Sequence, residues 1–318
     1  MTKKYGLISL GCPKNLVDSE IFSGIFESNE YVLTTDFQEA DFILINTCGF
    51  IADAKEEAVN TILETVELKK INPTLRIIAT GCFVKRYWNE IRTEIPEVDF
   101  WVNLKDFEKM AEILNCPYSS PNRNLLAAKH YAYLRISDGC NNHCSYCSIP
   151  SIRGSLHSVP IEELLTEANY LATLGVKELI VIAQDTAQYG TDLYGSQKLP
   201  ELLQLLHQIE NFKWIRVLYL HPAHLTSEII DTIAALPKVC KYFEVPLQHI
   251  NDTILQKMNR KITKENTMNR LSEIRTKIPD AVIRTTFIVG FPGETDKRFT
   301  ELKDFIVNQK FLRMGVFT

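Results

Sequence analysis

The sequence predicts a two-part α/β protein: an open parallel sheet covered by helices, followed by a partial (β/α)6 barrel. Three observations predict it. Short apolar runs typical of strands alternate with segments of helical periodicity along the chain. Helical segments between strands are typical of parallel sheets. A turn-rich stretch near residue 120 divides the alternation in two, and 318 residues with 45% hydrophobic composition favour two domains.

The first domain is predicted for residues 1–117. Its expected strands are Tyr5–Leu10, Asp41–Asn46, Leu75–Thr80 and Asp99–Val102. Its expected helices are Asn15–Ser28, Ala52–Ile71, Val84–Thr93 and Asp106–Leu114. Residues 118–130 are predicted to be a linker, because the stretch from Cys116 to Asn122 is rich in turn formers.

The second domain is predicted for residues 131–318, as a second βα series. Its expected strands are Tyr131–Ile136, Glu178–Ala183, Trp214–Leu220, Tyr242–Leu247, Val282–Val289 and Leu312–Phe317. Helical patterns lie between them, for example Ile161–Leu174, Leu199–Ile209 and Ser227–Leu236. Six strands are fewer than the eight of a complete barrel. Since the sequence stops on a strand, we expect it to be a fragment of a longer protein.

Composition and charge narrow the class of protein. The formal net charge is −4; residues 1–120 carry 12 basic and 19 acidic side chains, and residues 121–318 carry 23 and 20. This balance disfavours a nucleic-acid-binding protein, which would carry a strongly basic domain. The one basic cluster, Lys257, Arg260, Lys261 and Lys264, is interpreted as a solvated helix end. Eight cysteines without a secretory leader or membrane-spanning stretch predict a cytoplasmic protein with reduced thiols.

Cys140, Cys144 and Cys147 form a C-x3-C-x2-C triplet with no fourth cysteine nearby. Three thiolates on one loop can hold three irons of a [4Fe–4S] cluster and leave the fourth iron open for chemistry. The alternative is a zinc site with His143 or His157 as the fourth ligand. His143 is adjacent to Cys144, which makes joint ligation awkward, whereas His157 stays geometrically possible.

A second set, Cys12, Cys48 and Cys82, is spread over the first domain, and each member directly follows a predicted strand. Because ligands of open α/β sheets bind beyond the carboxyl ends of the strands, we expect these thiols to converge at one edge. A helix follows each cysteine, and its N-terminal dipole is expected to lower the thiol pKa. The alternative is three small buried residues. Two incomplete sets therefore predict two open clusters.

The cysteine pattern resembles the radical S-adenosylmethionine (SAM) superfamily and, with the upstream triplet, its methylthiotransferase branch. Within that branch the chain is similar to the ribosomal-protein aspartate methylthiotransferases, the RimO type. The matching segments are Ser9–Glu20, Ile136–Gly154, Ala183–Thr186, Tyr189–Gly190, Pro246–Asp252 and Ile288–Glu294. The resemblance covers essentially the whole chain. Family members usually continue into a small C-terminal β-barrel, the TRAM domain, and the resemblance implies that this sequence stops before it.

The resemblance implies an enzyme that adds a methylthio group to the β-carbon of an aspartate in a small-subunit ribosomal protein. Cys140, Cys144 and Cys147 would hold the [4Fe–4S] cluster that binds SAM, and the cleaved SAM would give a deoxyadenosyl radical. Cys12, Cys48 and Cys82 would hold an auxiliary [4Fe–4S] cluster that carries the sulfur, and a second SAM would supply the methyl group. An unactivated C–H bond requires such cofactor chemistry.

The other site residues are expected around SAM, while no catalytic side chain is assigned. Tyr146 is expected to pack over the cluster loop, and its alternative is a core aromatic. Gln184, Asp185, Gln248 and Glu294 lie at predicted strand ends, where they bind SAM or simply cap the strands. His221, His224 and His249 are assigned no role.

The implied partners are the aspartate-bearing loop of the ribosomal protein, an electron donor such as flavodoxin or ferredoxin, and a sulfide source, without a membrane. The closest alternative function is the sister enzyme that modifies a tRNA adenosine. Those enzymes usually have Gly-Cys-Gln-Met-Asn where this chain has Gly11–Asn15, and Val-Val-Pro-Tyr-Thr-Arg-Gly where it has Ser148–Gly154. Both differences favour the protein substrate. An alternative of another class is a non-catalytic, zinc-stabilised binding module.

Overall fold

The computed structural model describes residues 2–116 and 123–318, which group into two compact units. One lies within residues 1–127 and also includes residues 151–153; the other comprises residues 128–150 and 154–318. Both are α/β units with parallel sheets, which confirms the predicted fold class. The predicted domain limits, 1–117 and 131–318, stay predictions, and the predicted linker 118–130 lies partly outside the described residues.

The first unit is built on a five-stranded parallel sheet of order β2-β1-β3-β4-β5. Its strands are β1 (Lys3–Ser9), β2 (Tyr31–Leu33), β3 (Phe42–Thr47), β4 (Arg76–Gly81) and β5 (Phe100–Trp101). The edge strand β2 was not predicted, because three residues with a single buried side chain give no recognisable alternation. The strands that precede the three cysteines, β1, β3 and β4, are direct neighbours.

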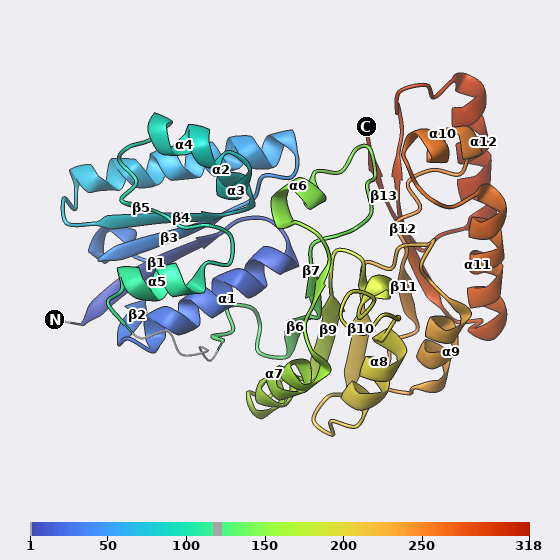
Figure 1. Ribbon diagram of the computed structural model, residues 1–318, viewed down its shortest axis with the longest axis horizontal. Coiled ribbons are helices and arrows are strands. Elements are labelled where there is room, and N and C mark those ends of the chain that lie inside the picture. Colours follow the sequence, from blue (N-terminus) through green and yellow to red (C-terminus); the bar gives the residue numbers. More distant parts are fainter. Residues whose placement is uncertain (1, 117–122) are drawn as a thin grey trace. The chain divides into compact units, whose positions relative to one another are not determined.

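Helices cover both faces of this sheet (Figure 1). The core under one face joins the sheet to α1 (Pro13–Glu27) and α5 (Phe107–Ile113). The core under the other face joins it to α2 (Ala52–Glu67), α3 (Cys82–Arg86) and α4 (Trp88–Glu94). The single helix predicted over 84–93 is two helices, since Tyr87 leaves helical geometry with φ −117° and ψ 31°. Short 3-10 turns occupy Phe37–Glu39 and Leu68–Lys70.

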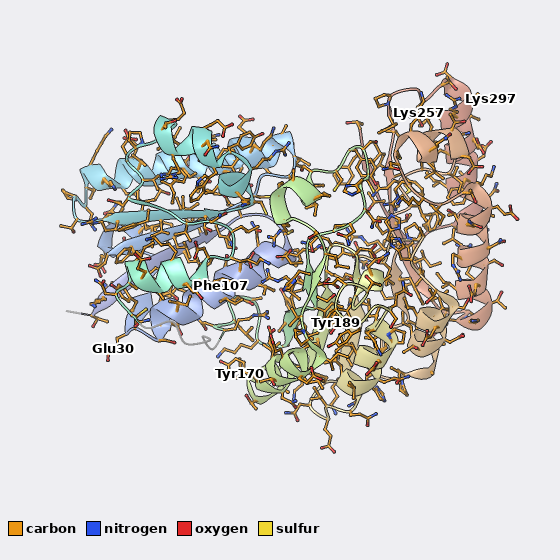
Figure 2. The ribbon with its side chains drawn as sticks, in the orientation of Figure 1. Glu30, Phe107, Tyr170, Tyr189, Lys257 and Lys297 are labelled. Carbon is orange, nitrogen blue, oxygen red and sulfur yellow. The ribbon has the colours of Figure 1, made fainter. Side chains whose placement is uncertain are left out.

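Aromatic side chains fix α1 against the sheet. Tyr5 stacks on Phe26 with ring centroids 4.3 Å apart. Phe22 and Phe107 pack edge to face with ring centroids 5.0 Å apart. Phe107 lies at the start of α5 (Figure 2). Such pairs contribute about 0.5–1.5 kcal/mol each beyond their buried area. This packing fixes the C-terminal half of α1 against the sheet.

The second unit contains the six predicted parallel strands. They are β6 (Tyr131–Arg135), β9 (Glu178–Ile182), β10 (Trp214–Val217), β11 (Tyr242–Glu244), β12 (Val282–Ile288) and β13 (Arg313–Phe317). They form the sheets β10-β9-β6 and β11-β12-β13, and the Leu220 amide donates to the Glu244 carbonyl between them at 2.9 Å. Strands in chain order are therefore spatial neighbours, as in a partial (β/α)6 barrel.

Helices lie on the outer side of these strands (Figure 1). They are α7 (Ile161–Thr173), α8 (Leu199–His207), α9 (Ser227–Ala235), α10 (Asp252–Lys257), α11 (Lys264–Lys277) and α12 (Asp296–Gln309), with a 3-10 turn at Thr186–Gln188. A short antiparallel strand pair that was not predicted consists of β7 (Ser137–Asp138) and β8 (His157–Ser158). It flanks the Cys140–Cys147 loop and the short helix α6 (Ile149–Arg153). No helix of the described residues is long and apolar enough to cross a bilayer.

Candidate functional site

The three dispersed cysteines lie at the carboxyl ends of three adjacent strands. Cys12 follows β1 and caps α1, Cys48 follows β3, and Cys82 follows β4 as the first residue of α3. Cys12 is exposed, Cys48 half-buried and Cys82 buried, and all three are free thiols. Cys12 and Cys48 are close enough to Cys82 to act on its ionisation. The chain therefore brings thiols that are far apart in sequence to one edge of the sheet.

Glycines beside these cysteines let the three loops approach one another closely. A Cβ on Gly11 would lie 2.8 Å from the Cβ of Cys48, and one on Gly81 would lie 2.4 Å from the Thr47 carbonyl oxygen. Both have positive φ, +95° and +101°, which L side chains rarely adopt. A Cβ on Gly49 would lie 2.7 Å from Phe83 Cα. The backbone around the thiols thus forms a tight cradle with no room for further side chains.

Asn15, on the first turn of α1, connects all three loops. Its Nδ2 donates to the Leu10 carbonyl at 3.0 Å and to the Thr47 carbonyl at 2.8 Å. Its Oδ1 accepts from the Cys82 thiol at 3.4 Å. Leu10 lies just before Cys12, and Thr47 directly precedes Cys48, so one buried side chain sets the spacing of the three cysteines. Asn15 was not predicted as a site residue, although it lies within the family-like segment Ser9–Glu20.

The expectation that helix N-termini lower the pKa of these thiols is wrong for two of the three. Burial raises the pKa of Cys48. Burial likewise raises the pKa of Cys82, to about 11, against the opposing effect of Arg153. Desolvation disfavours the thiolate more than a helix terminus stabilises it. In the metal-free chain both thiols are protonated at neutral pH, so metal binding must release their protons and is favoured as pH rises.

The C-x3-C-x2-C loop is held by the segment that ends α10. Ser145 donates through its amide to the Met258 carbonyl at 3.1 Å, and Asn259 Nδ2 donates to the His143 carbonyl at 2.7 Å. The Cys140 amide donates to the Gly154 carbonyl at 3.1 Å. Cys144 is buried, while Cys140 and Cys147 are half-buried. Burial raises the pKa of Cys140 to about 11 and raises that of Cys147.

Arg260 corrects one expectation from the sequence. Lys257, Lys261 and Lys264 are exposed, but Arg260 is only 6% exposed. Its Nη1 donates to Cys144 Sγ at 3.8 Å, and its Nη2 donates to the Pro246 carbonyl. The interpretation of this cluster as a solvated helix end is therefore wrong for Arg260. Sequence spacing gave no sign of the contact, because 116 residues separate the two partners.

Asp185 orients the cysteine loop through Asn142. Its Oδ2 accepts from Asn142 Nδ2 at 2.9 Å and is bonded to His224 Nδ1 at 2.6 Å. Asn142 in turn donates through its amide to Cys140 Sγ at 3.4 Å. The His221 ring stacks on His224, and burial lowers the pKa of His221 to about 2, so that this imidazole is neutral. Asn142 was likewise not predicted as a site residue.

The remaining predicted residues differ in how well their polar atoms are paired. Gln184 donates to Asp138 Oδ1 at 2.8 Å, but its Oε1 is buried without a partner. The Oε1 of Gln248 is likewise buried and unpaired, on a residue with φ +71°. Glu294 is bonded to His249 Nε2 at 2.9 Å. Burial raises the pKa of Tyr146, with Arg260 opposing, so the phenol stays protonated.

Asp185, His221 and His224 bring one ligand atom each within 4.8 Å of one another. We assign no metal to the Asp185 set, whose carboxylate is already hydrogen-bonded and which faces the positive charge of Arg260.

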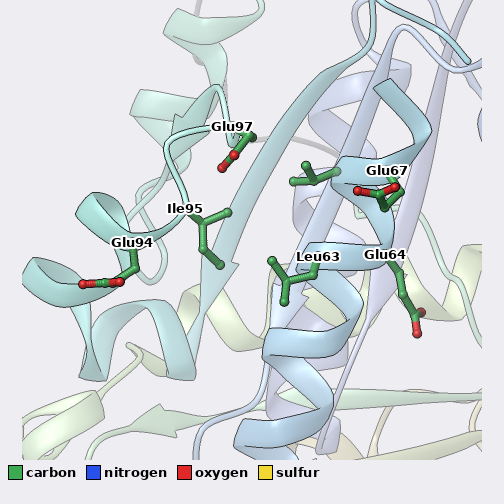
Figure 3. A pocket seen from close by; sticks show the side chains of 7 residues that line it. Leu63, Glu64, Glu67, Glu94, Ile95 and Glu97 are labelled. Atoms are coloured by element: carbon green, nitrogen blue, oxygen red, sulfur yellow. The ribbon is translucent and has the colours of Figure 1, made fainter. Parts of the chain in front are cut away.

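A hollow on the first unit lies apart from the thiols. Its volume is about 470 Å³. Figure 3 shows Leu63, Glu64 and Glu67 of α2 on one side and Glu94, Ile95 and Glu97 on the other. The acidic lining contains neither a cysteine nor a predicted SAM residue, so it contributes nothing to the candidate site.

Two family models match the chain. The one described as "Uncharacterized protein family UPF0004" matches residues 4–103, and the Radical SAM superfamily matches residues 134–306. The second match covers more than half of the chain and includes the whole C-x3-C-x2-C loop. The protein is thus a radical SAM enzyme, a class that uses SAM and a [4Fe–4S] cluster.

Curated relatives define the family within that class. The chain is 47% identical to "Ribosomal protein uS12 methylthiotransferase RimO" of Clostridioides difficile (strain 630) and 48% identical to the protein of that name from Clostridium kluyveri. Both alignments cover 99% of this chain and 74% of the relative. The chain belongs to the RimO family of radical SAM methylthiotransferases. Enzymes of this family carry a second cluster, so the non-catalytic zinc module is set aside.

Solved structures show the same fold at low identity. The radical SAM methyltransferase TsrM from Kitasatospora setae, with tryptophan and a SAM analogue bound, superposes with a TM-score of 0.70 at 12% identity. The match covers 99% of this chain and 72% of that one. The cobalamin-dependent SAM radical enzyme OxsB gives 0.66 at 11% identity, over 96% of this chain and 52% of that one. These matches support the architecture alone.

Replacing Gly139 with alanine is expected to disrupt the Cys140 loop. A Cβ there would lie 1.9 Å from the Ser155 carbonyl oxygen. Gly195→Ala is the matched control, because Gly195 has nearly the same φ, +74° against +73°, but open space around its Cβ position. The backbone cost shared by both variants is about 1–2 kcal/mol.

We expect Gly139→Ala to unfold at a markedly lower temperature than Gly195→Ala, and to retain less iron after anaerobic reconstitution. Thermal unfolding of the metal-free chains and iron analysis measure both effects. Equal values for the two variants would contradict the close approach of Gly139 to Ser155.

Proposed function

We propose that this chain adds a methylthio group to the β-carbon of an aspartate in ribosomal protein uS12. The observation that carries the proposal is the presence of one incomplete cysteine triplet in each unit of a RimO-family chain. The C-x3-C-x2-C triplet follows β6, the first strand of the partial barrel. The dispersed triplet lies at the carboxyl ends of β1, β3 and β4. Functional sites of both architectures lie at those ends.

We assign Cys140, Cys144 and Cys147 to the SAM-binding cluster. The assigned auxiliary-cluster ligands are Cys12, Cys48 and Cys82. The residues present fit these groups, because the thiols are free and lie at glycine-lined or hydrogen-bonded loops. When bound, the two clusters and SAM supply the radical C–H activation, the sulfur and the methyl group.

The chain's own residues hold and orient these groups. Asp185 and His224 fix Asn142, which fixes the loop of Cys140. Arg260 sets a buried positive charge and an N–H donor beside Cys144. The half-buried ring of Tyr146 lies on the same loop and covers part of it.

Gln184 and Gln248 are proposed to bind SAM directly. Each has a buried oxygen without a hydrogen-bond partner, which costs free energy unless a ligand supplies a donor. The amino group and ribose hydroxyls of SAM are donors of the required kind. Glu294 and Asp185 are proposed to act at the same end of the barrel, and both carboxylates are held by histidines.

The partners follow from this chemistry. The substrate is the aspartate-bearing loop of uS12, the reductant is a small donor such as flavodoxin or ferredoxin, and a sulfide source reloads the auxiliary cluster. Because ribosomes are the target, we place the reaction in the cytoplasm. The relatives' names favour this substrate over the tRNA adenosine that was the alternative.

Removing either unpaired oxygen should weaken SAM binding. We expect Gln184→Leu and Gln248→Leu each to raise the dissociation constant of SAM about tenfold, the effect of roughly 1.4 kcal/mol from one lost hydrogen bond. Equilibrium binding to the anaerobically reconstituted protein measures this. The exposed Gln208→Leu is the control. Wild-type affinity in both variants would rule out this role.

The substrate assignment is tested by the intact mass of uS12 from ribosomes of the source cell. With the full-length gene present we expect a mass increment of one CH2S on the aspartate-bearing peptide, and its loss on gene deletion. A gene carrying Cys82→Ala should not restore it, whereas Cys116→Ala, which changes a free thiol outside both triplets, should. Persistence of the increment without the gene would refute the assignment.

A further inference from the structure

Residues 151–153 group with the first unit, although the residues on both sides of them belong to the second. They end the short helix α6, which begins two residues after Cys147. The side chain of Arg153 is 1% exposed and lies at the edge of the sheet where Cys12, Cys48 and Cys82 converge. Its position in the sequence, six residues beyond the C-x3-C-x2-C triplet, gives no indication of this location.

The guanidinium of Arg153 contacts three groups of the cysteine cradle through one nitrogen. Nη2 donates to Asn15 Oδ1 at 2.7 Å, approaches Asp18 Oδ2 at 3.3 Å and lies 3.4 Å from Cys82 Sγ. Asn15 is the residue that connects the three loops. Arg153 therefore acts on a thiol directly and on the other two loops through Asn15.

Metal binding makes the position of Asn15 more dependent on its hydrogen bond from Arg153. In the metal-free chain Asn15 Oδ1 accepts from both Arg153 and the Cys82 thiol. A ligating cysteine is a thiolate and has no proton to donate. Arg153 then holds Asn15 Oδ1 alone, and it also presents a charged N–H to the Cys82 sulfur.

The burial of the Arg153–Asp18 pair needs a reason other than stability. Asp18 is fully buried beside an arginine that is 1% exposed. Burying two charges costs about as much as their attraction returns, so a buried ion pair alone is weak evidence for a stabilising role. Asp18 fixes the direction of the Arg153 guanidinium toward Cys82. Because hydrogen bonds to cluster sulfurs and nearby charges set the reduction potential of a cluster, this orientation is a reason for burying the pair.

We propose that Arg153 is a positioning residue of the auxiliary-cluster site, where it holds Asn15 and donates an N–H to the Cys82 thiolate. The inference rests on the proposed assignment of Cys12, Cys48 and Cys82 as cluster ligands. It implies that residues 1–127 do not complete this site, since the loop that follows the SAM-cluster triplet contributes to it. Lysine cannot replace arginine fully, because its ammonium is a strongly hydrated point charge on a flexible stem, whereas the guanidinium is planar and more weakly hydrated.

The experiment isolates the auxiliary cluster in the full chain. The parent carries Cys140→Ala, Cys144→Ala and Cys147→Ala, and Arg153→Met, Arg153→Lys and the exposed control Arg92→Met are added to it. After anaerobic reconstitution, we measure iron and sulfide per chain, the rate of iron loss to a chelator, and the midpoint potential of the cluster by electron paramagnetic resonance.

We expect Arg153→Met to bind the cluster ~10–100-fold more weakly, the usual effect of losing a residue that supports a ligand. Its midpoint potential should fall below that of the parent, because a positive charge and an N–H donor stabilise the reduced cluster. Arg153→Lys should shift both readouts in the same direction by less, and Arg92→Met should match the parent. The lysine variant keeps the charge beside Asp18, so its shift is readable even if the methionine variant folds poorly.

Parent-like potentials and iron loss in both Arg153 variants would overturn the inference while leaving the proposed function intact. A parent that holds no cluster would overturn the ligand assignment itself, and the role of Arg153 with it. A shift in Arg153→Met and Arg153→Lys but not in Arg92→Met supports the inference.

Discussion

Three neighbouring parallel strands, β1, β3 and β4, impose the constraint on which the rest of the site depends. Each strand ends in a cysteine-bearing loop, and parallel pairing places those loops at one edge. Strand pairing alone fixes the spacing of the three cysteines only coarsely. Asn15 refines it by donating to backbone carbonyls beside Cys12 and Cys48 and by accepting from the Cys82 thiol. The thiols are therefore arranged by the fold before any metal binds, which lowers the entropic cost of metal binding.

The second triplet is arranged by a different principle. Its cysteines share one loop, so sequence spacing sets their separation, and the fold has only to orient the loop. Asp185 orients the loop through its hydrogen bond with Asn142. Arg260, Met258 and Asn259, which follow α10, hold it through further hydrogen bonds. A buried arginine thus stands beside a cysteine at both sites, Arg260 at Cys144 and Arg153 at Cys82. Arg153 offsets part of the burial that raises the pKa of Cys82, and Arg260 offsets part of the burial that raises the pKa of Cys147.

The sequence predicted the strands and the cysteines because both are local patterns. A strand followed at once by a cysteine is visible along the chain, and adjacency of parallel strands then places the thiols. The supporting residues were not predictable in this way. Arg153 lies 71 residues from Cys82, Arg260 lies 116 from Cys144, and no periodicity connects them. The edge strand β2 was too short to recognise. The thiol pKa values were misjudged because burial, a tertiary property, outweighs the helix termini that the sequence reveals.

We propose that the chain holds two clusters on two separate sets of three cysteines. The most direct test is iron and sulfide analysis with Mössbauer spectroscopy of the anaerobically reconstituted protein and of two triple-alanine variants, one for each set. We predict about eight irons per chain in the wild type and about four in each variant, all as [4Fe–4S] clusters. Loss of all iron in either variant, or eight irons retained in one of them, would contradict the claim.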